Sequence, residues 1–145
     1  MTDYADPVLP HRYPFLFIER IISTPEEHAD GLLRALMCIS VSGGIHCDRF
    51  PFTFPSVILI EALAQAVGML IALQHTDKCE NMHGMLAGVR MARFRGAARP
   101  GDRLHLTVRL LRRRSSLVFL SGEVALKGQC LCKTTFSCAI QNNEM

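Results

Sequence analysis

The chain has 145 residues, of which 49% are hydrophobic and 20% are charged. This balance is too apolar for an intrinsically disordered chain, and the length is sufficient for a domain with its own core. The formal net charge of +3 is too small to require a nucleic-acid partner. We therefore expect one domain over residues 1–145 that binds no nucleic acid.

The six cysteines raise the question of disulfides. The start of the chain, from Met1 to Asp6, is polar and acidic, which is unlike a signal peptide, and no CxxC pair occurs. Cys130 and Cys132 share one face of an alternating segment, but no second pair of ligands accompanies them. We predict reduced thiols in a cytoplasmic protein, with no metal and no cofactor.

The first half of the chain predicts two strands and then one long helix. Segments 16–23 and 31–42 are strand-like. Segment 57–73 is almost entirely apolar and rich in Ala, Leu, Met and Gln, which favour a helix. Pro55 and Ser56 precede it, and we expect Ser56 to be its N-cap.

This expected helix has no polar face, so other elements must enclose it. It contains Glu61 and Gln65, and it is shorter than the ~20 residues that cross a bilayer comfortably. We therefore interpret it as a helix buried inside the protein and predict no membrane span.

The second half of the chain predicts antiparallel strands. Segment 104–110 alternates apolar residues with polar or charged ones, which indicates a strand with one wet face. Lys127 and Gly128 form a tight hairpin signal. The other strand-like segments are 85–95, 116–126 and 129–140. Strands, one buried helix and then more strands predict an α+β fold, in which a curved sheet wraps around the helix.

Three separate blocks of sequence resemble one known family. Residues 9–16 (LPHRYPFL) resemble the opening motif of the bacterial 3-hydroxyacyl-ACP dehydratases of the FabZ type. Residues 57–66 (VILIEALAQA) are similar to the central helix of that family. A third block matches in order and spacing: LAGV at 86–89, ARFR at 92–95 and PGD at 100–102.

The resemblance implies a hotdog fold and an obligate dimer with its active sites at the dimer interface. In the family, a histidine of one subunit faces a carboxylic acid on the central helix of the other. The substrate is a 3-hydroxyacyl thioester on the phosphopantetheine of an acyl carrier protein, and the reaction is reversible loss of water. The histidine moves the proton next to the carbonyl, and the acid assists departure of the hydroxyl.

The loop before the helix departs from the family pattern. The family reads HFPGxPxxPG, whereas this chain reads RFPFTFPS over residues 49–56. Phe50, Pro51 and Pro55 keep the anchor positions, but Arg49 occupies the position of the histidine. An arginine stays protonated, so Arg49 cannot act as the base. The loop is also two residues shorter, and Ser56 replaces the glycine whose N–H helps to hold the thioester carbonyl.

Glu61 keeps the position of the family's acid. It is either that retained acid or a buried glutamate satisfied by hydrogen bonds. Gln65 lies one turn later on the same helical face and is expected to support Glu61 or to line the acyl pocket. Gly88, in the third block, is a further expected substrate-binding position, and His46 is a candidate for a substitute base in a shifted loop.

A basic tract runs from Arg90 to Arg114, with nine arginines against the single acid Asp102. It is either a solvated strand face or a rim that attracts an acidic acyl carrier protein. The stretch lacks the interleaved aromatic residues typical of nucleic-acid binding. The candidates for contact with the carrier are Arg93, Arg95, Arg112, Arg113 and Arg114.

Four hypotheses follow. The chain is a homodimeric dehydratase with a rebuilt base, or it is a subunit that is impaired alone and pairs with an ordinary dehydratase chain. Either dimer can belong to a higher oligomer of dimers. Otherwise it binds acyl carriers without chemistry, or it is a thioesterase, since one fold hosts several activities. Loss of the histidine while Glu61 is kept favours the impaired subunit of a heteromeric dehydratase in fatty-acid or polyketide-type biosynthesis.

Overall fold

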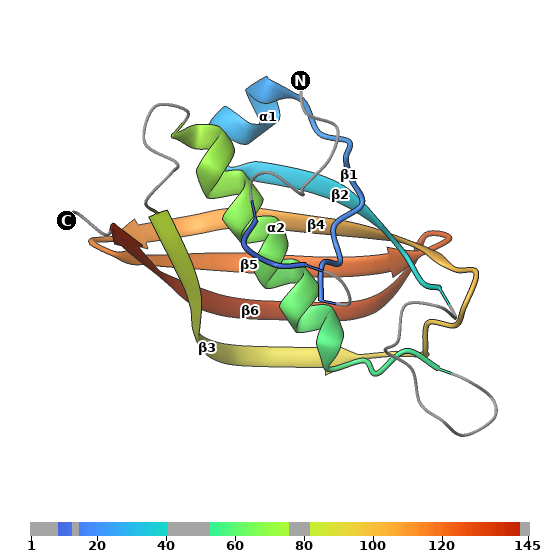
Figure 1. Ribbon diagram of the computed structural model, residues 1–145. Helices are drawn as coiled ribbons and strands as arrows, with labels where there is room; N and C mark the ends of the chain where they lie inside the picture. Colours follow the sequence, from blue (N-terminus) through green and yellow to red (C-terminus); the bar gives the residue numbers. More distant parts are fainter. Residues whose placement is uncertain (1–8, 13–14, 41–52, 76–81, 143–145) are drawn as a thin grey trace.

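The computed structural model describes residues 9–12, 15–40, 53–75 and 82–142 (Figure 1). Four residues of the predicted site, His46, Arg49, Phe50 and Pro51, lie outside the described residues.

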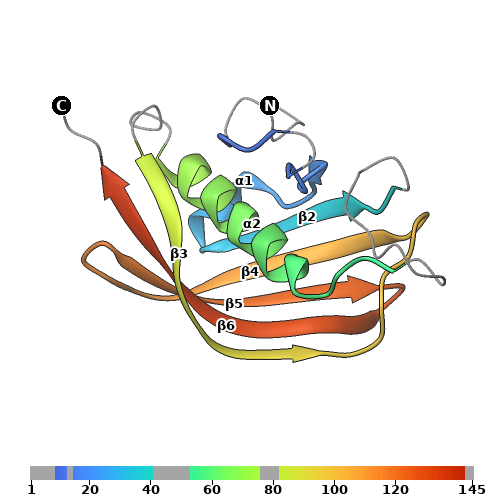
Figure 2. The same ribbon diagram turned by 60° about the horizontal axis from the view of Figure 1, so that its bottom comes forward.

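The described part of the chain forms a six-stranded antiparallel sheet and two helices. The sheet has the order β1-β2-β4-β5-β6-β3. Its strands are β1 (Arg20–Ile21), β2 (Leu32–Cys38), β3 (Met82–Phe94), β4 (Arg103–Arg114), β5 (Leu117–Leu126) and β6 (Gln129–Asn142). The helices are α1 (Pro25–Ala29) and α2 (Ile58–Gln74). In Figure 2 the sheet curves around α2, and β3 bends along its length.

The long strands follow the alternation of the sequence. In β4, Leu104, Leu106 and Val108 are fully buried, whereas the neighbouring Arg103 and His105 are exposed. The turn between β5 and β6 has positive φ at Lys127 (48°) and Gly128 (80°), as a two-residue hairpin with the right-handed strand twist requires. The predicted hairpin is therefore confirmed.

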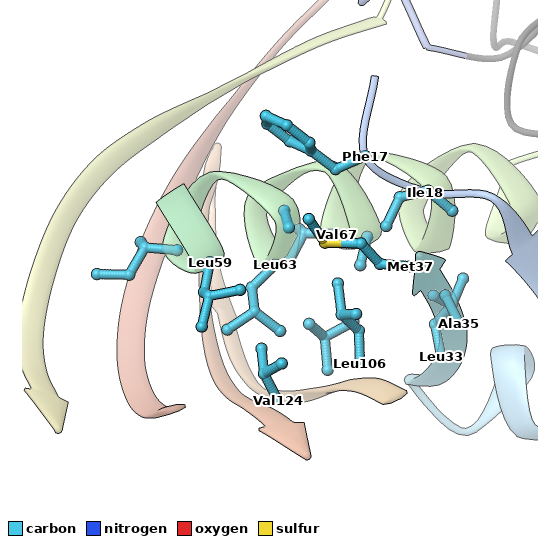
Figure 3. Packing of buried hydrophobic residues seen from close by; sticks show 14 of the residues in the cluster. Phe17, Ile18, Leu33, Ala35, Met37, Leu59, Leu63, Val67, Leu106 and Val124 are labelled. Carbon is cyan, nitrogen blue, oxygen red and sulfur yellow. The ribbon is translucent and has the colours of Figure 1, made fainter. Parts of the chain in front are cut away.

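The core lies between α2 and the concave face of the sheet. Leu59 and Leu63 of α2 point toward the sheet, where Leu106 and Val124 lie (Figure 3). Phe17 packs on the opposite side of the helix. Contacts on both sides explain why α2 has no polar face, and the predicted α+β fold with a curved sheet around a buried helix is confirmed.

The N-terminal prediction was wrong in detail. The expected strand over 16–23 is reduced to β1 (Arg20–Ile21), because Phe17 is bonded to the side chain of Gln65 on α2 instead of to a strand. Ser56 is not the N-cap; Val57 takes that place and makes no side-chain cap. The backbone carbonyls of Pro55 and Ser56 accept from the N–H groups of Ile58 and Leu59, so a serine side chain is not needed there.

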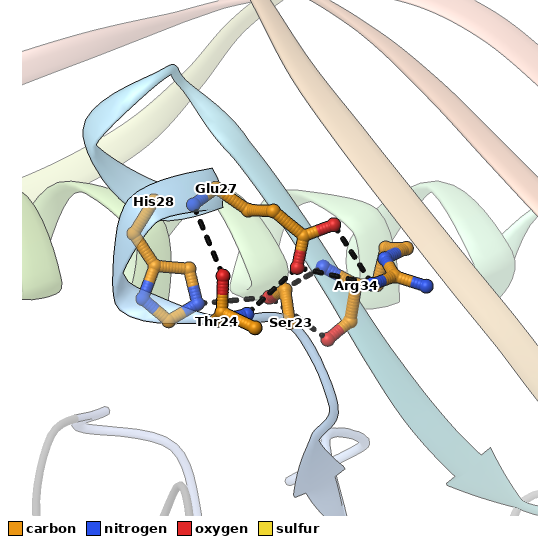
Figure 4. A network of polar contacts seen from close by, with 5 residues as sticks. All are labelled: Ser23, Thr24, Glu27, His28 and Arg34. Carbon is orange, nitrogen blue, oxygen red and sulfur yellow. Dashed lines mark hydrogen bonds and ion pairs between the residues drawn. The ribbon is translucent and has the colours of Figure 1, made fainter.

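Helix α1 was not predicted, and a compact polar network holds it (Figure 4). The Thr24 hydroxyl accepts from the Glu27 N–H, and the Glu27 carboxylate accepts from the Thr24 N–H, which is a capping box. Glu27 also pairs with the Arg34 guanidinium at 2.7 Å. Nε2 of the buried His28 lies 2.8 Å from the Ser23 hydroxyl, so the network ties α1 to β2.

Candidate active site

Glu61 lies in the first turn of α2 and lines a cavity of about 310 Å³. One wall of this cavity is a stripe of α2 that carries the small residues Ala64, Gly68 and Ala72. Met85 of β3 is on the opposite wall. A cavity lined by a carboxylic group and by apolar side chains is an arrangement that suits a substrate with a polar reacting end and an acyl tail.

Gln65 anchors the N-terminal strap, by which we mean residues 9–12 and 15–18, to α2. Its side chain is buried, with 1% of the residue exposed. Oε1 accepts from the Phe17 N–H at 2.9 Å, and Nε2 donates to the Phe15 carbonyl at 2.6 Å and to Oε1 of Glu61 at 3.3 Å. Gln65 therefore lies beside Glu61 at the cavity wall; its expected role, to support Glu61 or to line an acyl pocket, stays a prediction.

His11, on the strap, lies directly over Glu61. Its Nε2 is 3.2 Å from Oε1 of Glu61, and both side chains remain partly exposed. Sequence reasoning missed this contact because the two residues are 50 positions apart, and no local spacing relates them. His11 belongs to the opening block of the resemblance, but that block gave no role to it.

Cys138 of β6 forms another part of the cavity wall. Burial raises the pKa of the Cys138 thiol to about 11, and the negative charge of Glu61 contributes in the same direction. A thiol of this kind stays protonated near neutral pH and is a poor nucleophile. Cys138 therefore acts here as an apolar wall residue next to the carboxylic group.

The remaining predicted substrate contacts divide between two places. Pro55 and Ser56 precede α2, one turn before Glu61. Gly88 is on β3 opposite Ser137, and it lines a groove with Phe119 instead of the Glu61 cavity. In one chain, the structure therefore does not bring Gly88 together with Glu61.

The five candidate arginines also fall into separate regions. Arg93 pairs in register with Lys133, whereas Arg112 pairs with Phe119 and stacks on its ring at 4.6 Å. Nη1 of Arg113 lies 3.3 Å from Nε2 of His75, near the end of α2. Measured along β6, Arg93 is level with Lys133, Arg112 with Ser137 and Arg113 with Cys138. Arg112 and Arg113 therefore lie roughly 14 and 17 Å from Arg93 along the strands, and the arginines do not form one continuous rim in a single chain.

Strand β3 is an edge of the sheet and exposes apolar side chains. Met85 is 55% exposed, and Leu86, Val89 and Phe94 are each slightly above 40%. Met85 and Leu86 also line the Glu61 cavity. An exposed apolar edge is a template for pairing with another chain, and such a chain would meet the cavity at its β3 wall.

Within the described ranges, no group of three or more metal-ligating side chains comes together. In the same part of the chain, neither helix is long and apolar enough to cross a membrane.

Comparison with known proteins matches most of the chain. The sequence model of one family, described as FabA-like domain, matches residues 9–135. The 3-hydroxyacyl-[acyl-carrier-protein] dehydratase FabZ of Shewanella woodyi is 34% identical over 134 residues, which cover 90% of this chain and 86% of that protein. FabZ of Pseudoalteromonas translucida is 35% identical over 135 residues, with 91% and 87% covered.

Solved structures share the fold. A chain of the dehydratase heterocomplex ApeI:P from Xenorhabdus doucetiae aligns with a TM-score of 0.81 at 22% identity, over 97% of this chain and 92% of that chain. A hypothetical thioesterase with coenzyme A from Streptococcus pneumoniae aligns with a TM-score of 0.61 at 13% identity, over 80% and 83%. The predicted hotdog fold is confirmed. At identities this low, the activity of these proteins cannot be assigned to the present chain.

Proposed function

The chain belongs to the FabA-like family, among relatives of the FabZ-type 3-hydroxyacyl-[acyl-carrier-protein] dehydratases, and on that premise we propose that it is one subunit of a heteromeric dehydratase. In this proposal Glu61 is the acid, and an ordinary dehydratase chain supplies the histidine base. The observation that carries it is that Glu61 lines a cavity together with apolar side chains of α2 and β3, in a chain whose family histidine position is Arg49.

The proposed reaction is an elimination of water. The partner's histidine takes the proton from the carbon next to the thioester carbonyl, and a double bond forms between that carbon and its neighbour. The carbon–oxygen bond of the hydroxyl breaks, and the leaving oxygen takes the proton of the Glu61 carboxylic acid to become water. The base and the acid return to their starting states by exchange with solvent.

The exposed edge strand β3 supports the proposal of a partner subunit. It carries exposed apolar side chains along an edge of the sheet, and two of them, Met85 and Leu86, line the Glu61 cavity. A second subunit that pairs with β3 would bring its own loop to the cavity. In that arrangement Glu61 would serve one site of the complex, while the reciprocal site, with Arg49, would be inactive.

Acyl carrier protein is the proposed donor of the substrate. Among the candidate arginines, Arg95 lies closest in sequence to Ala98, whose carbonyl accepts from the N–H of Phe54 in the segment that leads into α2. We therefore favour Arg93 and Arg95 as carrier contacts over Arg112, Arg113 and Arg114. The predicted cytoplasmic location is part of the same proposal and rests on family membership.

The test is interconversion of 3-hydroxyacyl-ACP and enoyl-ACP, measured with the purified chain alone and then with a dehydratase chain from the same cell. We expect turnover only in the mixture, with a loss of at least a hundredfold in Glu61→Gln and no change in the control Glu123→Gln on β5. Turnover by the chain alone, lost in Glu61→Gln, would overturn the impaired-subunit proposal in favour of a rebuilt base such as His46.

Two other outcomes would point to the alternatives. Binding of acyl-ACP without turnover in any mixture would indicate a binding module. Release of a free thiol from the thioester would indicate a thioesterase in which Glu61 activates water.

A further inference from the structure

The two carboxylate oxygens of Glu61 have different surroundings. Oε1 receives contacts from His11 at 3.2 Å and from Gln65 at 3.3 Å. Among the described residues, no hydrogen bond or ion pair of Oε2 accompanies them. We propose that His11 is a positioning residue that, together with Gln65, holds Oε1 so that Oε2 carries and delivers the proton. This inference rests on the proposed function of Glu61 as the acid.

The orientation of the Gln65 amide is fixed by its backbone partners. The Phe17 N–H can only donate, so the atom that faces it must be Oε1 of Gln65. Nε2 then faces the Phe15 carbonyl and Glu61, and it donates to both. The hydrogen bond from Gln65 to Oε1 of Glu61 therefore follows from the fold of the strap. It does not depend on whether substrate is bound.

The tautomer of His11 follows from its other ring nitrogen. Nδ1 is buried and has no hydrogen-bond partner among the described residues. A buried N–H without an acceptor is rarer and more costly than an unused lone pair. We therefore assign the hydrogen to Nε2, which points at Oε1 of Glu61, so that His11 donates there as Gln65 does.

The strap fixes the position of the imidazole above α2. Leu9 packs on the helix at Gly68, where a Cβ atom would come within 3.1 Å of Leu9 Cδ2. Arg12 braces the segment, because its Nη1 donates to the carbonyls of Leu9 and His11 at 2.6 and 2.7 Å. His11 thus lies between Leu9, which is held by packing on α2, and Phe15, whose carbonyl is held by Gln65.

The two carboxylate oxygens of Glu61 therefore have different chemical roles. A proton on Oε1 would displace one of the two N–H donors, so the acidic proton belongs on Oε2. When Oε2 gives this proton to the leaving hydroxyl, negative charge develops on the carboxylate. The hydrogen bonds from His11 and Gln65 to Oε1 strengthen as that charge appears, and they favour the transition state over the ground state.

The kinetic test uses the mixture of this chain with the dehydratase chain. His11→Phe keeps a ring of similar size but has no donor, whereas His11→Gln places an N–H at about the reach of Nε2. We expect kcat to fall about tenfold in His11→Phe with KM within twofold, and His11→Gln to recover most of kcat. His105→Phe, on the exposed face of β4, is the matched control and should change neither constant.

A spectroscopic test does not require turnover. In the full chain with ¹⁵N-labelled histidine rings, we expect His11 to carry its hydrogen on Nε2, and this signal to move in Glu61→Gln while that of His105 stays in place. A hydrogen on Nδ1, or a signal indifferent to Glu61→Gln, would overturn the assignment. Melting temperatures of all variants separate these effects from loss of the fold.

The outcomes separate the inference from the proposed function. If Glu61→Gln abolishes turnover but His11→Phe keeps the wild-type kcat, only the positioning role is overturned. An equal loss in His11→Phe and His11→Gln also overturns it, since the donor would then be irrelevant. If turnover in the mixture is indifferent to Glu61→Gln, the proposed function fails, and His11 then positions no catalytic acid.

Discussion

The side chain of Gln65 replaces a strand partner for Phe17. The Phe17 N–H, which a longer β1 would have paired with a neighbouring strand, donates instead to Oε1 of Gln65 at 2.9 Å. Among the described residues, Gln65 is one of few buried polar side chains, and its hydrogen bonds join α2 to the strap and to Glu61. One residue therefore connects the fold of the N-terminus to the candidate acid.

Replacing Gln65 by leucine should destabilise the fold. Leucine has a similar volume, but the Phe17 N–H and the Phe15 carbonyl would lose their partner inside the protein. We expect the free energy of unfolding to fall by about 2–4 kcal/mol, as measured by urea denaturation. Gln74→Leu is the control, because Gln74 is less buried and, among the described residues, its side chain makes one hydrogen bond, to the His28 carbonyl. Equal losses in the two variants would contradict the role of Gln65 as the strap anchor.

Close approach of α2 to the sheet makes Gly122 on β5 sensitive to substitution. A Cβ atom at this position would lie 2.9 Å from Leu63 Cδ1 and 3.1 Å from Phe136 Cε1. Both neighbours are buried core side chains, so we expect Gly122→Ala to cost about 1–3 kcal/mol of stability. Gly84→Ala on β3 is the matched control, because no atom lies within 4 Å of its Cβ. A neutral Gly122→Ala would mean that the helix can move away from the sheet.

The parts of the fold that could be predicted are those determined by residues close to one another in the sequence. Alternation in β4 places Leu104 inside and His105 outside, and that pattern was readable from the sequence. Lys127 and Gly128 marked the hairpin because few residues accept positive φ. The capping box of Thr24 and Glu27 is also local, and α1 could have been found from it.

The parts that were not predictable depend on contacts between distant segments. Nothing near Phe17 shows that its N–H binds a glutamine 48 residues later, and so the strand over 16–23 was overextended. The same holds for His11 and Glu61, which only the strap brings together. The position of Glu61 was anticipated from the resemblance, whereas its surroundings required the folded chain.

Stability should decrease with acidity because of His28. Burial lowers the pKa of His28 below its ordinary value of 6.5, while the charges of Glu27 and Glu26 oppose the shift. As the pH falls below about 6.5, the unfolded chain takes up this proton before the folded chain does. The contribution of His28 is therefore complete above that pH and is lost as the pH falls toward the lower pKa of the folded state.

The measurement is the free energy of unfolding from pH 7.5 to 5.5 for the wild type and for His28→Gln. Glutamine retains a donor and an acceptor near Ser23 but does not titrate in this range. We expect a shallower decline in the variant, and no such change in His105→Gln. Parallel curves for wild type and His28→Gln would show that His28 does not supply the pH dependence.

The buried thiol of Cys138 should react slowly. Its pKa is about 11 because of burial, whereas Cys38 is exposed at the end of β2, where a hydrogen bond with Glu19 also raises the pKa of its thiol. At pH 8, peptide-resolved alkylation of the native protein should be at least about a hundredfold slower at Cys138 than for a free thiol. Because the charge of Glu61 contributes to the raised pKa of Cys138, Glu61→Gln should speed its reaction. A fast reaction at Cys138 in the wild type would contradict the enclosed cavity wall.

We predict that another subunit associates with this chain through the edge strand β3. Val89 is apolar and 42% exposed on this edge strand, and a lysine there would oppose pairing with another chain. We expect Val89→Lys to raise the dissociation constant of the dimer, or of the complex with a dehydratase chain, at least tenfold in sedimentation experiments. Ile22→Lys is the control, because Ile22 is 37% exposed and directly follows β1, at the opposite edge of the sheet from β3. If Ile22→Lys weakened association while Val89→Lys did not, the partner would bind at the β1 edge, and Glu61 would need another source for its base.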